Sequence, residues 1–169
     1  NLEMLVKGFD IAARRHPHIK LLLAGSGETF NDVHAIATAL PCSDRIEFTG
    51  SYTAKDLVEL YGKTDIGILP YAEQQFRQYT LPNKAFDYMA CGKPIISSGL
   101  RPMKRLLDQT GAGIYGPCET PEHIAALIDS MLSSDIPAMA ENGMESFKNT
   151  YNWGQDFQQI LASIDYTLS

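Results

Sequence analysis

The sequence has few cysteines and lacks any long run of apolar residues. Its three cysteines, Cys42, Cys91 and Cys118, are widely spaced and match neither a metal-binding motif nor a disulfide framework. An odd number of scattered cysteines favours a reducing, cytosolic setting. No stretch of about 18 uninterrupted apolar residues occurs, which argues against a transmembrane helix.

The sequence also lacks an excess of positive charge and any cluster of metal ligands. Its net charge is −6, so we expect no general binding to nucleic acid. The four histidines form no ligand pattern, and no Asp-x-Asp motif occurs. The closely placed carboxylates that a glycosidase needs are missing as well. We therefore expect neither a metal site nor a cofactor.

The first residues already have a helical pattern. Apolar side chains recur with helical spacing between Leu2 and Ala13, and no signal-peptide core precedes them. Because the sequence starts at Asn1 with this pattern, we expect it to be a fragment of a longer protein. We treat residues 1–169 as one domain, a usual size for a chain with a proper core.

Apolar runs and helical patterns alternate along most of the chain. Short apolar runs suited to buried strands occupy 19–25, 45–50, 65–71, 93–98 and 112–116. Helical patterns occupy 1–17, 29–40, 52–63, 82–91, 101–109, 120–133, 137–150 and 153–168. This alternation predicts an α/β fold, a Rossmann-like doubly wound parallel sheet of about five or six strands with helices on both faces. Thr53 and Thr120 are the expected N-caps of their helices, the latter followed by Pro121.

The first predicted strand ends in a glycine turn, Gly25-Ser26-Gly27. Glycines let the backbone turn sharply and let a ligand approach, and amides at a following helix start favour anions. Phe30 stands where a dinucleotide fingerprint needs its third glycine, so the sequence does not match the nicotinamide-binding fingerprint. An ordinary strand-to-helix turn explains the motif equally well.

The segment YTLPNKAFDYMACGKPIISS (79–98) predicts a helix that begins at a proline. Pro82 suits the first helical turn, which makes Leu81 the geometric cap. Leucine has no oxygen to accept the first amide hydrogens, so Thr80, water or a ligand such as a phosphate must do so. Lys84 would add a positive charge there.

Three polar residues lie near the start of this helix. Asn83, Lys84 and Asp87 fall within one turn of each other, and Asp87 could accept hydrogen bonds from the two hydroxyls of a ribose. Alternatively, Lys84 and Asp87 form an exposed pair that contributes about 0.2–0.5 kcal/mol.

Basic residues gather around the same segment. Between Arg77 and Leu107 there are six basic residues and one acidic residue, Asp87. This clustering arises either by chance on a solvated face or because the segment forms a pocket that attracts an anion.

Four stretches together resemble a known family. LLLAGSGE, RIEFTG, LYGKTDIGILPY and LPNKAFDYMACGKPIISS, in this order, resemble the C-terminal domain of the group 1 glycosyltransferases, retaining enzymes with the two-domain GT-B architecture. The resemblance covers nearly the whole chain. It implies that this domain binds the nucleotide of a sugar-nucleotide donor, and that the domain binding the acceptor lies outside this sequence.

The resemblance also implies roles for particular residues. Gly25, Ser26 and Gly27 would lie by the diphosphate, and Asp87 would bond the ribose hydroxyls, where glutamate is commoner. The residues Thr80, Leu81, Pro82 and Asn83 would lie against the phosphates and the sugar. The stretch from Gly50 to Tyr52 would lie near the base, with Tyr52 either stacking on the base or packing as a surface aromatic.

The sequence departs from the family in two places. Tyr79 stands where the family often has a glutamate near the donor sugar, and Glu73, in the same loop but out of register, is the candidate that remains. The family's basic residues that clamp the phosphates precede the first helix, so in this protein they would precede Asn1. The last helix, 153–168, would pack back toward the missing domain.

The implied activity is transfer of a sugar from a UDP- or GDP-sugar to a glycan or glycolipid acceptor with retained anomeric configuration. The family's usual settings, polysaccharide and glycolipid assembly, imply a cytoplasmic protein, with peripheral association at the inner face of the membrane left open. Two alternatives also stay open. One is half of a sugar-nucleotide epimerase of the same architecture, and the other is a flavodoxin-like or receiver-like regulatory domain without enzymatic activity.

Overall fold

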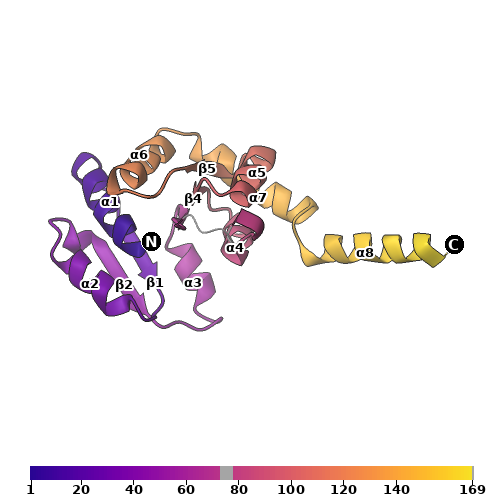
Figure 1. Ribbon diagram of the computed structural model, residues 1–169, viewed down its shortest axis with the longest axis horizontal. Helices are drawn as coiled ribbons and strands as arrows, with labels where there is room; N and C mark the ends of the chain where they lie inside the picture. Colours follow the sequence, from indigo (N-terminus) through magenta and orange to yellow (C-terminus); the bar gives the residue numbers. More distant parts are fainter. Residues whose placement is uncertain (73–77, 169) are drawn as a thin grey trace.

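In the computed structural model, which describes residues 1–72 and 78–168, parallel strands alternate with helices (Figure 1). The strands are β1 (Leu21–Ala24), β2 (Ile46–Gly50), β3 (Gly67–Leu69), β4 (Ile95–Ser98) and β5 (Gly113–Gly116). The helices are α1 (Leu2–Arg15), α2 (Phe30–Thr38), the 3-10 turn η1 (Ser43–Arg45), α3 (Leu57–Gly62), α4 (Asn83–Ala90), α5 (Arg101–Thr110), α6 (Pro121–Leu132), α7 (Ile136–Asn149) and α8 (Trp153–Leu168). The predicted α/β class is confirmed.

The strands form two sheets, where the sequence predicted one. β1 pairs with β2, while β4 lies between β3 and β5, and all these pairs are parallel. Among the described residues, no strand joins β1 to β3. The expectation of one continuous sheet is therefore wrong for the described residues, because none of their strands pairs with the open edge of β1 or of β3.

Helices cover both faces of these strands, as a doubly wound fold requires. The alternation of side chains along β4 shows the two faces, because neighbouring residues point to opposite sides. Ile96 belongs to an apolar cluster with α1, α2 and α6, whereas Ile95 belongs to a second cluster with α4 and α5. Each face thus has its own core, and β4 contributes to both.

The sequence predicted the N-cap of one helix, α6, correctly and that of another, α3, incorrectly. Thr120 caps α6 as expected, and its Oγ1 accepts a hydrogen bond from the His123 amide at 3.3 Å. Thr53 does not cap α3, which begins only at Leu57. Instead, the Asp56 carboxylate accepts from the Thr53 amide and hydroxyl, at 2.7 and 2.8 Å. This local turn competes with the helix for residues 53–56.

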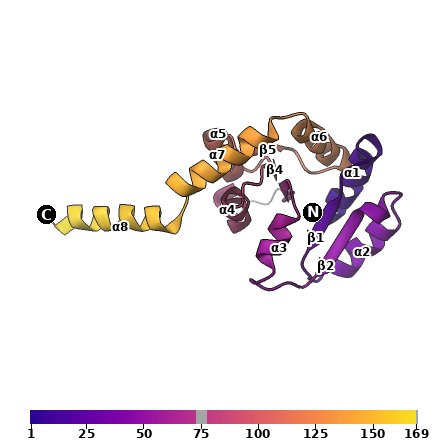
Figure 2. The same ribbon diagram turned by 180° about the vertical axis from the view of Figure 1, so that it is seen from behind.

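The C-terminal helix α8 extends away from the rest of the molecule (Figures 1 and 2). Its first turns expose two large aromatic side chains, Trp153 at 73% and Phe157 at 44%. Both terminal helical stretches predicted from the sequence are present as α7 and α8. That α8 packs toward a further domain remains a prediction.

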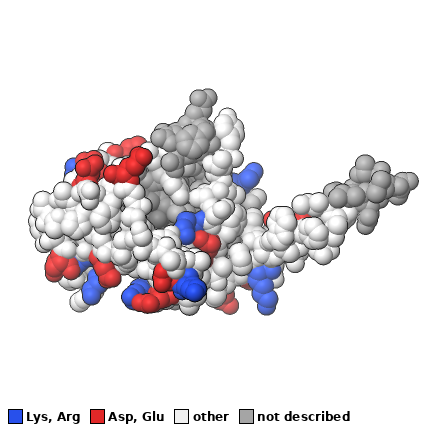
Figure 3. Space-filling view, turned by 90° about the horizontal axis from the view of Figure 1, so that it is seen from below, with Lys and Arg blue, Asp and Glu red and all other residues white. Residues whose placement is uncertain are grey.

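The surface mixes the two signs of charge. Figure 3 shows acidic and basic side chains side by side on one face of the molecule, without a broad area of one sign. Within the described residues, no helix combines the length and the apolar character that crossing a membrane requires.

Candidate nucleotide-binding site

The carboxyl ends of β1 and β2 form a double bend rich in glycine. The Gly25 amide donates to the Gly50 carbonyl at 2.9 Å, and the Ser26 and Ser51 hydroxyls lie 2.5 Å apart. Gly25 and Gly50 have φ values of 131° and 69°, in a range that residues other than glycine rarely adopt. Both glycines are therefore needed for the two loops to approach each other at the end of the sheet.

The glycine turn lines a hollow of its own. Gly25, Ser26 and Gly27 border a cavity of about 230 Å³ together with aromatic side chains of α2 and β2, Phe30 and Phe48. The hollow lies at the carboxyl edge of parallel strands, where open α/β sheets bind ligands. The sequence predicted this position for the turn.

The start of α4 has no capping side chain, as expected, although the cap lies one residue later. The helix begins at Asn83, and Pro82 is the N-cap in an extended conformation, with φ −73° and ψ 133°. The prediction that Leu81 is the cap is therefore wrong, because the extended Pro82 cannot be part of the helix. Within the described part of the chain, no side chain bonds the first amides of α4.

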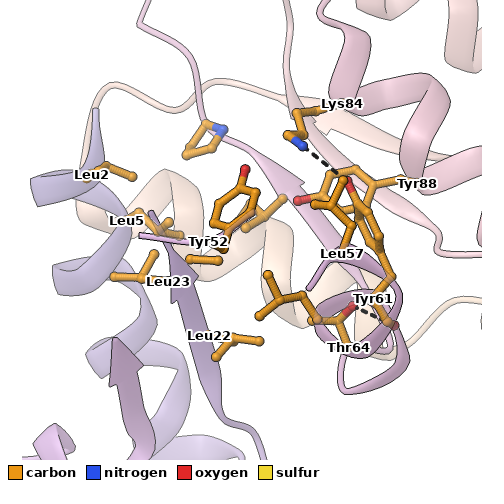
Figure 4. A pocket seen from close by; sticks show the side chains of 14 residues that line it. Leu2, Leu5, Leu22, Leu23, Tyr52, Leu57, Tyr61, Thr64, Lys84 and Tyr88 are labelled. Carbon is orange, nitrogen blue, oxygen red and sulfur yellow. Dashed lines mark hydrogen bonds between the residues drawn. The ribbon is translucent and has the colours of Figure 1, made fainter. Parts of the chain in front are cut away.

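Lys84, Asp87 and Tyr61 form a hydrogen-bonded triangle between α4 and α3. The Lys84 ammonium lies 3.2 Å from Asp87 Oδ2, the Tyr61 hydroxyl donates to the same oxygen at 3.1 Å, and Lys84 donates to the Tyr61 hydroxyl at 3.3 Å. The Lys84 nitrogen also lies 5.8 Å from the ring centroids of both Tyr52 and Tyr61. The predicted i,i+3 pair is thus present as part of a larger cluster. Figure 4 shows Lys84 and Tyr61, which belong to this cluster, on opposite sides of their hydrogen bond.

The triangle changes how two of its members titrate. Burial lowers the pKa of Lys84, but hydrogen bonds to Tyr61 and Asp87 outweigh it and raise the pKa above its usual range. Burial raises the pKa of Tyr61 to about 12, with Lys84 acting in the opposite direction. At neutral pH the cluster therefore contains a lysine cation and a protonated tyrosine that donates to a carboxylate oxygen.

The structure brings some of the predicted site residues together and separates others. Tyr52 and Lys84 line one hollow, between β1 and β3, and this hollow adjoins the one at the glycine turn through Leu2, Leu23 and Ala24. Asn83 and Asp87 border a different depression toward α7 and α8.

The remaining candidates lie around these hollows or outside the described residues. Leu81 borders a depression with Arg101 and Arg105, and Thr80 is exposed. Tyr79, which replaces the family's glutamate, is 76% exposed. Glu73 lies outside the described residues, so its role stays a prediction.

The basic residues of this region do not converge on one pocket. Lys84 lies in the triangle, Lys93 borders a groove between α3 and α4, and Lys104 lies over the Tyr115 ring. Arg101 and Arg105 share the depression at Leu81. The described members of the cluster are therefore distributed over several surfaces, and the hypothesis of a single anion pocket is wrong for them.

Sequence reasoning missed Tyr61. It lies on α3, one turn after Leu57, and both residues line the hollow between β1 and β3. The spacing of Leu57, Leu60 and Tyr61 on one helical face was the only available signal. That signal predicts packing and cannot reveal a hydrogen bond to a residue 26 positions away.

A family model described as "Glycosyl transferases group 1" matches residues 1–134. The chain belongs to this family. A Bacillus subtilis protein named for glycosyl transfer in teichuronic acid biosynthesis is 27% identical over 151 residues, which cover 89% of this chain and 37% of that protein. The chain therefore spans well under half the length of this relative.

Two solved structures share the fold. The Anabaena protein HepE, solved in complex with UDP, superimposes with a TM-score of 0.77 at 16% identity, covering 96% of this chain and 44% of HepE. The C-terminal domain of LpcC, a group 1 protein of Francisella tularensis, gives 0.72 at 14% identity, covering 89% of this chain and 79% of that domain. The predicted fold, the C-terminal half of a GT-B glycosyltransferase, is confirmed.

Proposed function

We propose that the full-length protein transfers a sugar from a nucleoside-diphosphate sugar to a glycan or glycolipid acceptor with retained configuration, and that this domain binds the donor nucleotide. Family membership supports a transferase over the epimerase and regulatory alternatives. The observation that carries the proposal concerns the start of α4, which has no capping side chain. Lys84, in the first turn of α4, lines a hollow that adjoins the one at the Gly25–Gly27 turn.

The phosphates are the part of the donor for which these elements are best suited. Backbone amides at a helix start carry partial positive charge, and glycines let an anion approach the backbone. In this proposal the diphosphate lies between the Gly25–Gly27 turn and the segment from Thr80 to Asn83. Lys84 adds a cation, and the amides stabilise the negative charge that develops on the departing diphosphate.

The nucleoside would lie toward Asp87 and Tyr52. Both hydrogen bonds to the Asp87 carboxylate reach Oδ2, so Oδ1 is the oxygen that a ribose diol would meet. Tyr52 would stack on the base. The Lys84 ammonium lies over the Tyr52 ring, so it would have to move away to expose the ring face to the base. UDP is the first nucleotide to test, because HepE was solved with UDP.

The test is a nucleotide titration on the full-length protein. UDP, GDP and ADP are added separately while melting temperature and intrinsic fluorescence are followed. We expect one of them to raise the melting temperature, and Asp87→Ala to weaken its binding by at least about tenfold, or 1.4 kcal/mol. The matched control is Asp44→Ala, because Asp44 is exposed in η1, which precedes the amino end of β2.

The same preparation tests the reaction. With a binding donor and a glycan or glycolipid acceptor, NMR of the product should show the anomeric configuration of the donor. If no nucleotide stabilises the protein, or if Asp87→Ala binds as tightly as Asp44→Ala, the assigned site is wrong. An inverted product would contradict retention alone.

A further inference from the structure

A depression beside the first turns of α5 is bordered by two arginines. Its lining residues come from the loop before α4 and from α5 itself: Gln78, Tyr79, Leu81, Arg101, Pro102 and Arg105. Its volume of about 360 Å³ lies within the roughly 300–1,000 Å³ of typical small-molecule sites. Because α5 follows β4 in the chain, the depression lies at the carboxyl edge of the parallel strands, where open α/β sheets bind ligands.

The guanidinium groups of these two arginines are unpaired within the described part of the chain. Arg14 and Arg15 bind carboxylates of other residues, and Arg45 donates to two backbone carbonyls. Neither the Arg101 nor the Arg105 guanidinium has a hydrogen bond or an ion pair to any described residue. The described residues that border the depression also include no carboxylate. An anion that enters it would therefore meet two guanidiniums whose donors are free.

The positions of these arginines in α5 are unfavourable for the helix itself. Arg101 is the first residue of α5, where the helix dipole disfavours a cation. Arg105 lies four residues on, and like charges at this spacing repel each other. The first turn of α5 has no acidic residue, whereas α1 and α6 have Glu3 and Glu122 in theirs. Departures from such local rules are expected mainly at functional sites.

Two arginines at this spacing are suited to hold one oxyanion. Side chains four residues apart on a helix are neighbours, with about 5–6 Å between their Cβ atoms. The planar guanidinium of arginine binds a carboxylate or a phosphate through two parallel hydrogen bonds. Arg101 and Arg105 therefore offer matching donors for either group from adjacent positions on one wall of the depression.

The depression adjoins the proposed phosphate site. Leu81 borders it and belongs to the segment from Thr80 to Asn83, against which the diphosphate lies in the proposed function. The Arg101 amide donates to Gln78 Oε1 at 3.1 Å, which holds the loop before this segment against α5. The donor sugar is bonded to the diphosphate, and the acceptor must meet that sugar. Groups of both substrates therefore come to this edge of the domain.

We propose that Arg101 and Arg105 bind an oxyanion of the substrate, a carboxylate or a phosphate, beside the transferred sugar. The anion belongs either to the donor sugar, as in a uronic acid, or to the acceptor. The inference rests on the proposed function for the position of the diphosphate, and it deepens that function by assigning an acidic substrate. The nucleotide does not contact these arginines, so they select the sugar or the acceptor.

Donor binding to the full-length protein tests the first source. UDP-glucuronic acid and UDP-glucose differ at C6, where one has a carboxylate and the other a hydroxymethyl group. We expect calorimetry to show at least about tenfold tighter binding of the acidic donor by the wild type, and Arg101→Gln and Arg105→Gln to lose this preference. If GDP is the nucleotide that binds, GDP-mannuronic acid and GDP-mannose take their place.

Lys104→Gln is the matched control for both variants. Lys104 is exposed on the same helix and lies over the Tyr115 ring, outside the depression. Its substitution removes the same charge and should keep the preference for the acidic donor, and UDP alone should bind all the variants equally. Because each arginine substitution removes a repulsion in α5, neither should lower the melting temperature. Unchanged melting separates a lost contact from a lost fold.

Glucose 6-phosphate and glucose test the second source. Each is titrated with and without saturating UDP. We expect an anion site for the acceptor to bind the phosphate compound at least about tenfold more tightly than glucose, in the wild type and Lys104→Gln but not in the arginine variants.

The two titrations together decide the proposal. A preference for the charged compound in either titration, lost in Arg101→Gln or Arg105→Gln and kept in Lys104→Gln, supports it and identifies the source. Equal binding of charged and neutral compounds in both titrations overturns it, as does a preference that survives both arginine substitutions or is lost equally in Lys104→Gln. If no nucleotide binds, the proposed function is wrong, and glucose 6-phosphate without UDP still decides whether the arginines bind an anion.

Discussion

At the scale of single residues, Tyr61 connects the two helices that flank the candidate site. Its hydroxyl donates to Asp87 and accepts from Lys84, so it sets the position of both side chains. Tyr61→Phe removes these bonds and keeps the ring. We expect the free energy of unfolding to fall by about 0.5–1.5 kcal/mol, measured by urea denaturation. Tyr79→Phe is the control, because Tyr79 is 76% exposed, and it should change stability by less than about 0.5 kcal/mol.

The same hydroxyl predicts a dependence on alkaline pH. The pKa of Tyr61 is raised to about 12, above the value near 10 of a free tyrosine. Between these pH values the unfolded chain releases the proton while the folded chain retains it, so the free energy of unfolding falls as pH rises. The difference in stability between wild type and Tyr61→Phe should therefore shrink between pH 10 and 12. A constant difference would show that the hydroxyl titrates as in the unfolded chain.

At the scale of elements, the start of α4 lacks a capping side chain and is the proposed contact of the ligand's phosphates. An uncapped helix start leaves amides for an anion, whereas a serine at the N-cap would bond them itself. Pro82→Ser should therefore weaken nucleotide binding without lowering the free energy of unfolding of the free protein. Pro82→Ala is the matched control, because it removes the ring without adding an oxygen. Equal affinities of the two variants, measured by calorimetry, would mean that the amides of α4 do not contact the ligand.

Two other helix starts differ in their capping and so offer a direct comparison. Thr120 accepts a hydrogen bond from the His123 amide, while Thr29, at the start of α2, makes no such bond. Thr120→Ala should lower the free energy of unfolding by about 1 kcal/mol, and Thr29→Ala should leave it within about 0.5 kcal/mol. Urea denaturation measures both. Similar losses for the two variants would contradict the assignment of the caps.

Local sequence signals predicted the elements well but not all of their ends. The order of strands and helices follows from apolar periodicity, and the Thr120 cap follows from its sequence with Pro121. The delayed start of α3 does not follow from the sequence. The Asp56 carboxylate could support either a helix cap or the turn with Thr53 that the structure has. Such choices depend on a balance of a few tenths of a kcal/mol to about 1 kcal/mol.

At the scale of the whole molecule, the long-range arrangement could be predicted only in part. Alternating elements indicated parallel strands with helices on both faces, and the glycine turn and the α4 start were placed at the ends of strands. The division into two sheets was not predictable, since local patterns do not reveal which strands are neighbours. The Tyr61–Asp87 contact was missed for the same reason, because it joins separate helices.

The packing of α1 against α6 joins the half of the molecule that contains β1 and β2 to the half that contains β3, β4 and β5. The contact between these two helices depends on one glycine. A Cβ on Gly8 would lie 2.6 Å from the Pro121 carbonyl oxygen and 2.7 Å from Ile124 Cβ, so no side chain fits between the helices. Gly8→Ala should therefore force α1 away from α6 and lower the free energy of unfolding by about 1–3 kcal/mol, although alanine favours helices. Calorimetric melting and urea denaturation measure the loss.

Gly62, the last residue of α3, provides the opposite case. A Cβ there would meet nothing within 4 Å, so Gly62→Ala should leave stability unchanged or raise it by up to about 1 kcal/mol. Since both substitutions add the same methyl group to a helix, their difference isolates the contact between α1 and α6. If Gly8→Ala were as stable as Gly62→Ala, the helices would have to lie farther apart, and the apolar cluster that α1 and α6 share with Ile96 would have to be packed differently.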